Sequence, residues 1–265
     1  MSESPAPLPP PRSPRLSVWT WAAIVLLAAF LLQGLGQAQV TPQRLGTGLT
    51  NLGQFLGQAF PPDFSRIGPL AIAMHETLLM AFVGVGLGVI LSLPVAVLSA
   101  RNTSPHPVVR TASRLIIAVF RTIPDLVWAM VFLVAVGFGP LAGILAIVAD
   151  TMGFCARFFS ERIEEIRPGP AEALASTGAG RTGIICGAII PEAFPSFVAT
   201  SLYAVEKSVR AAVVLGLVGA GGIGVELRSA MNLFQYPQAL TIILLILIVV
   251  IGCEQASSFL RKRLI

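Results

Sequence analysis

The sequence predicts an all-α integral membrane protein with about six transmembrane helices, and three observations support this prediction. Of the 265 residues, 55% are hydrophobic and only 12% are charged. The mean hydropathy of +0.81 lies outside the usual range of soluble domains. Several apolar stretches reach the roughly 20 residues that a helix needs to cross a bilayer. Helices are expected because they satisfy their backbone hydrogen bonds without water.

The chain divides into three expected regions. Residues 1–17 are rich in proline and are expected to form a disordered cytoplasmic tail. Residues 18–70 hold an anchor helix and an extracytoplasmic segment, and residues 71–265 form the main transmembrane domain. The expected transmembrane helices cover residues 18–36, 71–98, 114–137, 140–158, 184–205 and 238–260.

The first helix has two interpretations. Basic residues precede it, and Gly36-Gln37-Ala38 resembles the cleavage site of a signal peptide. We favour an uncleaved anchor, because an integral membrane protein does not require removal of its first helix. The next segment has apolar residues at helical spacing until Pro61-Pro62, which indicates an amphipathic helix on the outer surface. A loose extracytoplasmic loop is the alternative. The apolar positions are Leu45, Leu49, Leu52, Phe55, Leu56, Ala59 and Phe60.

The net charge of +5 indicates an orientation in the membrane and requires no nucleic acid. Of the 18 basic residues, 13 fall where a single topology places them on one side. Because cytoplasmic loops are enriched in lysine and arginine, both termini and the loop around Glu172 are expected in the cytoplasm. The 13 residues are Arg12, Arg15, Arg101, Arg110, Arg114, Arg121, Arg157, Arg162, Arg167, Arg181, Arg261, Lys262 and Arg263, and the opposite side has Arg44, Arg66, Lys207, Arg210 and Arg228.

The cysteines and histidines do not indicate a metal site or a disulfide. Cys155, Cys186 and Cys253 are scattered near the expected cytoplasmic ends of helices, where the compartment is reducing. His75 and His106 do not complete a set of metal ligands with them. We therefore expect no bound metal.

Ionisable residues inside the expected helices are candidates for a transport pathway. Arg121 and Asp125 are four residues apart, on one face of a helix that Pro124 is expected to bend. Charged groups in a membrane are costly, so they pair with one another or line a polar cavity, and both interpretations remain open. Asp150, in the fourth helix, presents the same choice. Asp125 and Asp150 could also relay protons.

A glycine-rich stretch follows the fifth expected helix and contains a formal GxGxxG pattern. Dinucleotide binding also needs a preceding strand, a following helix and an acidic residue about 20 positions later, but residues 244–249 contain no acid. Irregular backbone at membrane depth is tolerated only where protein buries it or water reaches it. The pattern therefore predicts a re-entrant gate or a hairpin lining the pore. The glycines are Gly219, Gly221, Gly222 and Gly224, whereas Gly84, Gly86 and Gly88 of the second helix are typical of close helix packing.

The polar loop between residues 159 and 183 is expected to hold a short helix at the membrane surface. Pro168-Gly169-Pro170 should end the preceding helix, and Pro170 suits the first turn of the next one. Residues 171–177 favour a helix that Gly178 can terminate in a left-handed conformation. An ordinary solvated loop is the alternative that periodicity alone leaves open.

This loop resembles the EAA loop of ABC importer permeases. Glu172, Ala173, Gly178 and Pro191 match the pattern, whereas Leu174, Ala188 and Ile190 differ from the usual alanine, isoleucine and leucine. Together with the segments 121–128, 167–170 and 210–224, residues 70–265 resemble the phosphonate-importer permeases, a group that includes phosphite importers.

The resemblance implies a permease subunit without enzymatic activity of its own, located in a bacterial inner membrane. Its expected partners are a second copy of the chain, two ABC ATPase subunits that bind the ATP, a periplasmic solute-binding protein and membrane lipid. Glu172, Ala173, Gly178 and Pro191 are the expected coupling residues, and the substrate is expected to be a phosphonate or phosphite. An oxyanion in a low-dielectric core needs compensation from cations or dipoles, and Arg121, Lys207 and Arg210 are the candidates. Two alternatives are that Glu206 pairs with Arg210 and that Lys207 faces water. The alternative is an ATP-independent, proton-coupled transporter or channel that uses Asp125 and Asp150.

Overall fold

The computed structural model describes residues 17–38 and 41–264, and these residues form helices and no strands. The chain comprises two compact units, Met1–Gly57 and Gln58–Ile265. The expected proline-rich tail lies outside the described residues except for Ser17.

The first unit contains α1, Val18–Gln37, and most of α2, Pro42–Ala59. α1 is 20 residues long and apolar enough to cross a membrane. α2 confirms the helix expected from the spacing of leucines such as Leu45, Leu49 and Leu52. It ends before Pro61, because a residue that precedes proline disfavours helical backbone angles.

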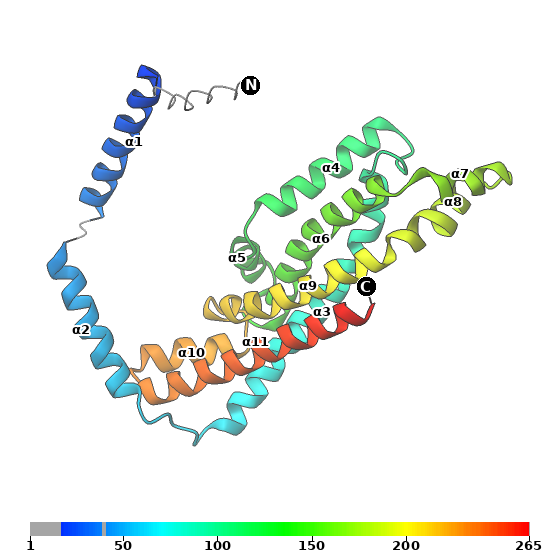
Figure 1. Cartoon of the computed structure of the whole chain (residues 1–265). Coiled ribbons are helices and arrows are strands. Elements are labelled where there is room, and N and C mark those ends of the chain that lie inside the picture. The colour runs from blue at the N-terminus through cyan, green and yellow to red at the C-terminus, as the bar shows by residue number, and fades with distance from the viewer. Residues whose placement is uncertain (1–16, 39–40, 265) are drawn as a thin grey trace, which may run out of the picture. The chain divides into compact units, whose positions relative to one another are not determined.

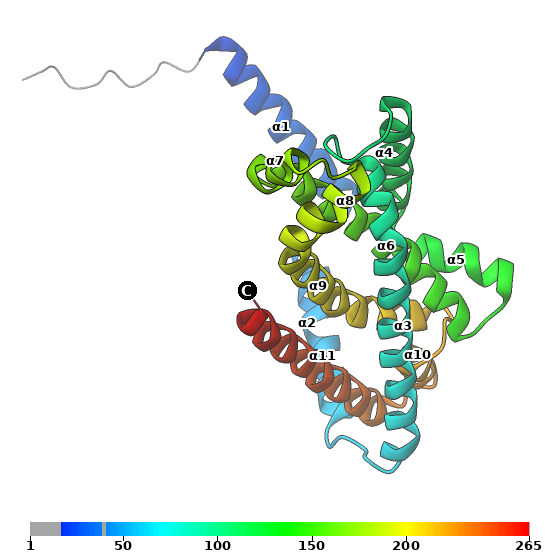
Figure 2. The ribbon, with the colours of Figure 1, turned by 90° about the vertical axis from the view of Figure 1, so that its right-hand side faces the viewer.

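The second unit consists of helices arranged as in Figures 1 and 2. Long helices alternate with short ones, and one π-helix, η1, lies directly before α9. The elements are α3 (Ile67–Ser99), α4 (Pro107–Thr122), α5 (Asp125–Val136), α6 (Pro140–Glu165), α7 (Pro168–Ser176), α8 (Arg181–Ile184), η1 (Ile185–Ile189), α9 (Ile190–Leu217), α10 (Ile223–Asn232) and α11 (Tyr236–Leu264).

The described residues contain five helices or continuous helical runs long and apolar enough to span a membrane, and a bent pair that could form a sixth span. The bent pair is α4 with α5, which meet at 91°. The expected span over residues 114–137 is therefore made of two helices, which meet at the position where a bend was expected. Pro124 is the physical reason, because it disfavours helical angles at Ile123 and removes a backbone donor.

The core of the second unit forms where α3 crosses α6. A Cβ atom on Gly84 would lie 2.6 Å from Cγ2 of Ile147, and one on Gly88 would lie 2.7 Å from Cβ of Thr151. These two glycines confirm the expected close packing, because no larger residue fits. Gly86 does not share this role, since a Cβ atom added there would meet nothing within 4 Å. Gly86 instead lines an apolar groove of about 540 Å³ between α3 and α9.

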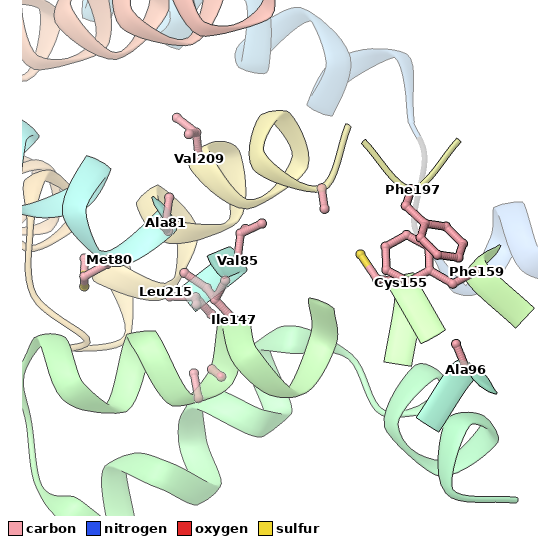
Figure 3. Packing of buried hydrophobic residues seen from close by; sticks show 14 of the residues in the cluster. Met80, Ala81, Val85, Ala96, Ile147, Cys155, Phe159, Phe197, Val209 and Leu215 are labelled. Atoms are coloured by element: carbon pink, nitrogen blue, oxygen red, sulfur yellow. The ribbon is translucent and has the colours of Figure 1, made fainter. Parts of the chain in front are cut away.

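Aromatic and aliphatic side chains from α3, α6 and α9 complete the core. Figure 3 shows the rings of Phe159 and Phe197 against one another, with centroids 4.3 Å apart. Val85, Ile147 and Leu215 are buried in the same cluster. Two segments that the sequence analysis singled out lie on opposite sides of this core. α7, in the polar loop, is at one end of the unit, and α10, after the glycine-rich stretch, is at the other end in both views (Figures 1 and 2).

Candidate coupling and pathway sites

The loop that matches the EAA pattern contains the surface helix α7. α6 ends at Glu165, and α7 begins at Pro168, so the break falls earlier than expected and both prolines lie in the first turn. None of the nine residues of α7 is buried. Glu172 and Ala173 are exposed, and Leu174 faces inward, with Cδ1 3.3 Å from where a Cβ on Gly187 would lie. α7 is thus anchored on one side and presents the other to solvent.

Gly178 ends the α7 segment as expected. Its φ is 85°, in the left-handed region that glycine adopts without a steric penalty. Its N–H donates to the carbonyl oxygen of Ala175 at 3.0 Å, and the N–H of Ala179 donates to that of Leu174 at 3.4 Å. The chain therefore reverses sharply from α7 into α8.

Pro191, the last residue that matches the EAA pattern, lies at the second position of α9. The π-helix η1, which is five residues long, directly precedes α9. A proline ring clashes with the carbonyl group four residues earlier in an α-helix, which here is that of Gly187. The wider turn relieves that clash, so Pro191 accounts for a π-helix between α8 and α9.

Arg121 and Asp125 do not share a helical face, contrary to the prediction. Arg121 lies in the last turn of α4, and Asp125 is the first residue of α5, on opposite sides of the 91° bend. Oδ1 of Asp125 accepts a hydrogen bond from the N–H of Leu126 at 2.9 Å, at an end of α5 that favours negative charge. Within residues 17–38 and 41–264, the two side chains make no ion pair with one another.

The glycine-rich stretch forms the turn of a helical hairpin. α9 ends at Leu217, and α10 returns over only ten residues, about 15 Å, which is too short to span a membrane. A Cβ on Gly224 would lie 2.2 Å from the carbonyl oxygen of Val213, so the two helices approach through glycine. The positive φ angles are 109° at Gly219, 91° at Gly221 and 69° at Gly222. This arrangement confirms a re-entrant segment.

Side chains of α3 hold the glycine turn, and sequence reasoning gave them no role. Oγ1 of Thr77 accepts a hydrogen bond from the N–H of Ile223 at 2.8 Å, and Oε1 of Glu76 accepts one from Gly222 at 3.3 Å. On the opposite side, the N–H of Gly139 donates to the carbonyl oxygen of Gly219 at 3.2 Å. Glu76 and Gly222 are 146 residues apart, and no local pattern connects positions at such a separation.

Lys207 and Arg210 lie inside α9, not beyond a helix that ends at residue 205 as the sequence suggested. Nζ of Lys207 donates to both carboxylate oxygens of Asp150, at 2.8 and 2.7 Å. The Asp150 side chain is 18% exposed and that of Lys207 is 35% exposed. Arg210 approaches Glu206 at 3.5 Å, as expected. Neutralisation by Asp150 explains how α9 continues through a charged position.

These features define a multi-pass helical membrane protein with an exposed surface helix at one end and a re-entrant hairpin at the other. Comparison with known proteins identifies the class. Residues 88–261 match the family described as binding-protein-dependent transport system inner membrane component. The chain belongs to this family of ABC importer permeases.

Two curated relatives are similar over most of this chain. The phosphite transport system permease protein PtxC of Stutzerimonas stutzeri is 37% identical over 239 residues, which cover 90% of this chain and 85% of that protein. The phosphate-import permease protein PhnE of Mycolicibacterium smegmatis is 40% identical over 227 residues, or 84% of this chain. The matched region is only 42% of the length of that second relative.

Solved structures agree with the fold. An inward-facing structure of the MetNI methionine ABC transporter superposes with a TM-score of 0.66. The match covers 76% of this chain and 99% of that chain at 24% identity. This similarity supports the helical architecture of an ABC importer permease.

Proposed function

We propose that this chain is the membrane subunit of an ATP-driven importer for a small phosphorus oxyanion, a phosphonate or phosphite. The main observation behind the proposal is α7, an exposed helix in the EAA segment that connects two long apolar helices. The substrate class follows from the relatives, since a phosphite permease is 37% identical over 90% of this chain.

The coupling residues of the proposal are Glu172, Ala173, Gly178 and Pro191. Glu172 and Ala173 face solvent on α7 and are available to an ATPase subunit. Gly178 fixes the angle between α7 and α8 through its left-handed conformation. Pro191, with the preceding η1, provides a hinge through which a displacement of α7 and α8 turns α9, because π-helical segments often occur at functional sites.

The proposed pathway runs along α6 and α9, where Lys207 pairs with Asp150, and past the glycine turn. An oxyanion in a low-dielectric core needs cations or dipoles for compensation. Of the candidates, Arg121 makes no ion pair among the described residues, whereas Lys207 and Arg210 would have to exchange Asp150 and Glu206 for the anion. Gly219, Gly221, Gly222 and Gly224 shape the hairpin that acts as the gate. Asp125 holds the start of α5 beside this pathway and is assigned no proton-carrying role.

The working complex has two copies of this chain, two ABC ATPase subunits and a periplasmic solute-binding protein. ATP is bound and hydrolysed by the ATPase subunits, and this chain binds no cofactor. Both termini lie in the cytoplasm, since the basic end of α11, Arg261-Lys262-Arg263, favours that side. Residues 1–17 are a tail, residues 18–70 an anchor with an extracytoplasmic segment, and residues 71–265 the permease domain.

Purification in mild detergent followed by mass spectrometry tests the proposed assembly. We expect an ABC ATPase to copurify in equal amounts with this chain. We also expect phosphite or methylphosphonate uptake into liposomes to require ATP and the binding protein. A chain that purifies alone and transports in response to a proton gradient without ATP contradicts the proposal and supports the use of Asp125 and Asp150 as proton carriers.

A further inference from the structure

The connection between α3 and α4, residues 100–106, lies at the same end of the second unit as α7 (Figures 1 and 2). It is short, and its backbone is bonded to parts of the chain that are distant in sequence. Thr103 is buried, and its Oγ1 donates to the carbonyl oxygen of Val97 at 2.6 Å. The connection is therefore a defined structure that can transmit a displacement.

Arg181 joins this connection to α8. Its Nη2 group donates to the carbonyl oxygen of Thr103 at 3.1 Å and also to that of Ser104. Arg181 is the first residue of α8 and follows Gly178 by three positions. The residue that begins the segment after α7 thus holds a loop 78 residues earlier in the chain.

The other side of the same connection is fastened to α6 and α4. Glu164 of α6 accepts hydrogen bonds from the Arg101 backbone N–H at 2.7 Å and from Nη2 of Arg114 at 2.6 Å. Nε of Arg114 also donates to the carbonyl oxygen of Ser99 at 3.1 Å. Nδ2 of Asn102 donates to the carbonyl oxygen of Ile163 at 2.6 Å. These bonds join the connection, the end of α6 and α4 into one body.

We propose that Arg181 is a positioning residue that transmits displacement of α7 and α8 to this body, and through it to α4. The inference rests on the proposed coupling role of α7. The covalent route through η1 moves α9, whereas Arg181 provides a second route to α4, the helix whose last turn contains Arg121. Transmission requires that a rigid element respond as a unit, and the bonds of Glu164, Arg114 and Asn102 provide that rigidity.

The first test separates ATP hydrolysis from transport in the complete complex with its ATPase subunits and binding protein. Arg181→Met removes the donors and keeps an unbranched side chain. We expect ATP hydrolysis to persist and methylphosphonate uptake per ATP hydrolysed to fall about tenfold, within the range typical of coupling between sites. Arg181→Lys, which keeps a charged donor, should recover part of the loss.

Arg110→Met is the matched control, because it removes one arginine of α4 whose side chain makes no hydrogen bond or ion pair among the described residues. It should leave uptake per ATP unchanged. Equal ratios for Arg181→Met and Arg110→Met overturn the inference but leave the proposed function intact. A wild-type complex without ATP-dependent uptake contradicts the proposed function itself.

The second test measures the movement of α4 directly. A nitroxide on a cysteine at exposed position 111, in a background without Cys155, Cys186 and Cys253, reports the distance between the two copies. We expect this distance to change on ATP binding in the otherwise wild-type complex and to stay fixed in Arg181→Met. An unchanged distance in the wild-type complex overturns the inference even if the methionine variant does not assemble.

Discussion

The two ends of the permease unit differ in how tightly their backbones are held. At the α7 end, no residue of the helix is buried, and a Cβ on Gly169 would meet nothing within 4 Å. At the glycine turn, a Cβ on Gly222 would lie 2.3 Å from Oγ1 of Thr77. The difference shows that the turn is held by contacts within the chain, whereas α7 is exposed along its length.

The largest expected effect comes from adding one methyl group at each end. Gly222→Ala places a side chain at a φ of 69° and against Thr77, so we expect a loss of about 2–4 kcal/mol of stability. Gly169→Ala should be close to neutral. Thermal unfolding of both purified variants in detergent measures the difference, and equal melting temperatures would contradict a tightly held turn.

Removing the acceptor at the turn should have a smaller effect. Thr77→Val keeps the shape of the side chain but leaves the buried N–H of Ile223 without its partner, which costs about 1–3 kcal/mol. Thr77→Ser should retain most of the stability, because its hydroxyl group can still accept the bond. Thermal unfolding gives the order, and a valine variant as stable as the serine variant would show that the hydrogen bond does not hold the turn.

The ion pair between Lys207 and Asp150 provides a third test. Lys207→Gln leaves the carboxylate of Asp150, which is 18% exposed, without its cation, and we expect a loss of about 1–3 kcal/mol. Adding Asp150→Asn should recover part of this loss, since the unpaired charge is then gone. The comparison uses thermal unfolding at one pH and salt concentration. A double variant less stable than the lysine variant alone would argue against mutual neutralisation.

At the α7 end, stability and function should separate. Gly178→Ala places a Cβ at a φ of 85°, which costs about 1–2 kcal/mol, less than Gly222→Ala. Gly178→Asp should lower ATP-driven uptake strongly while the protein still inserts into the membrane. Membrane fractionation and uptake assays measure the two effects separately. Normal uptake by the aspartate variant would exclude a coupling role for this position.

Hydropathy and proline or glycine signals predicted most of the fold, because those signals are local. Gly178 ends α7 as expected, and the glycine stretch forms a re-entrant hairpin. The prediction that Arg121 and Asp125 share a helical face was wrong, because Pro124 separates two helices that meet at 91° and does not merely bend a single helix.

Contacts between distant segments could not be predicted from the sequence alone. Lys207 and Asp150 are 57 residues apart. The sequence around each of them does not indicate which residue will be its partner. The same holds for Glu76 with Gly222. The expected end of the fifth helix at residue 205 was too early, because the partner of Lys207 on α6 lets α9 continue to Leu217.

Uptake into liposomes that contain the purified permease with its ATPase subunits and binding protein tests the central claim most directly. We expect phosphite or methylphosphonate to accumulate only when ATP is present on the side of the membrane that carries the ATPase subunits. We also expect Gly178→Asp to abolish this uptake without preventing assembly of the complex. Accumulation driven by a proton gradient in the absence of ATP, unaffected by Gly178→Asp, would contradict it.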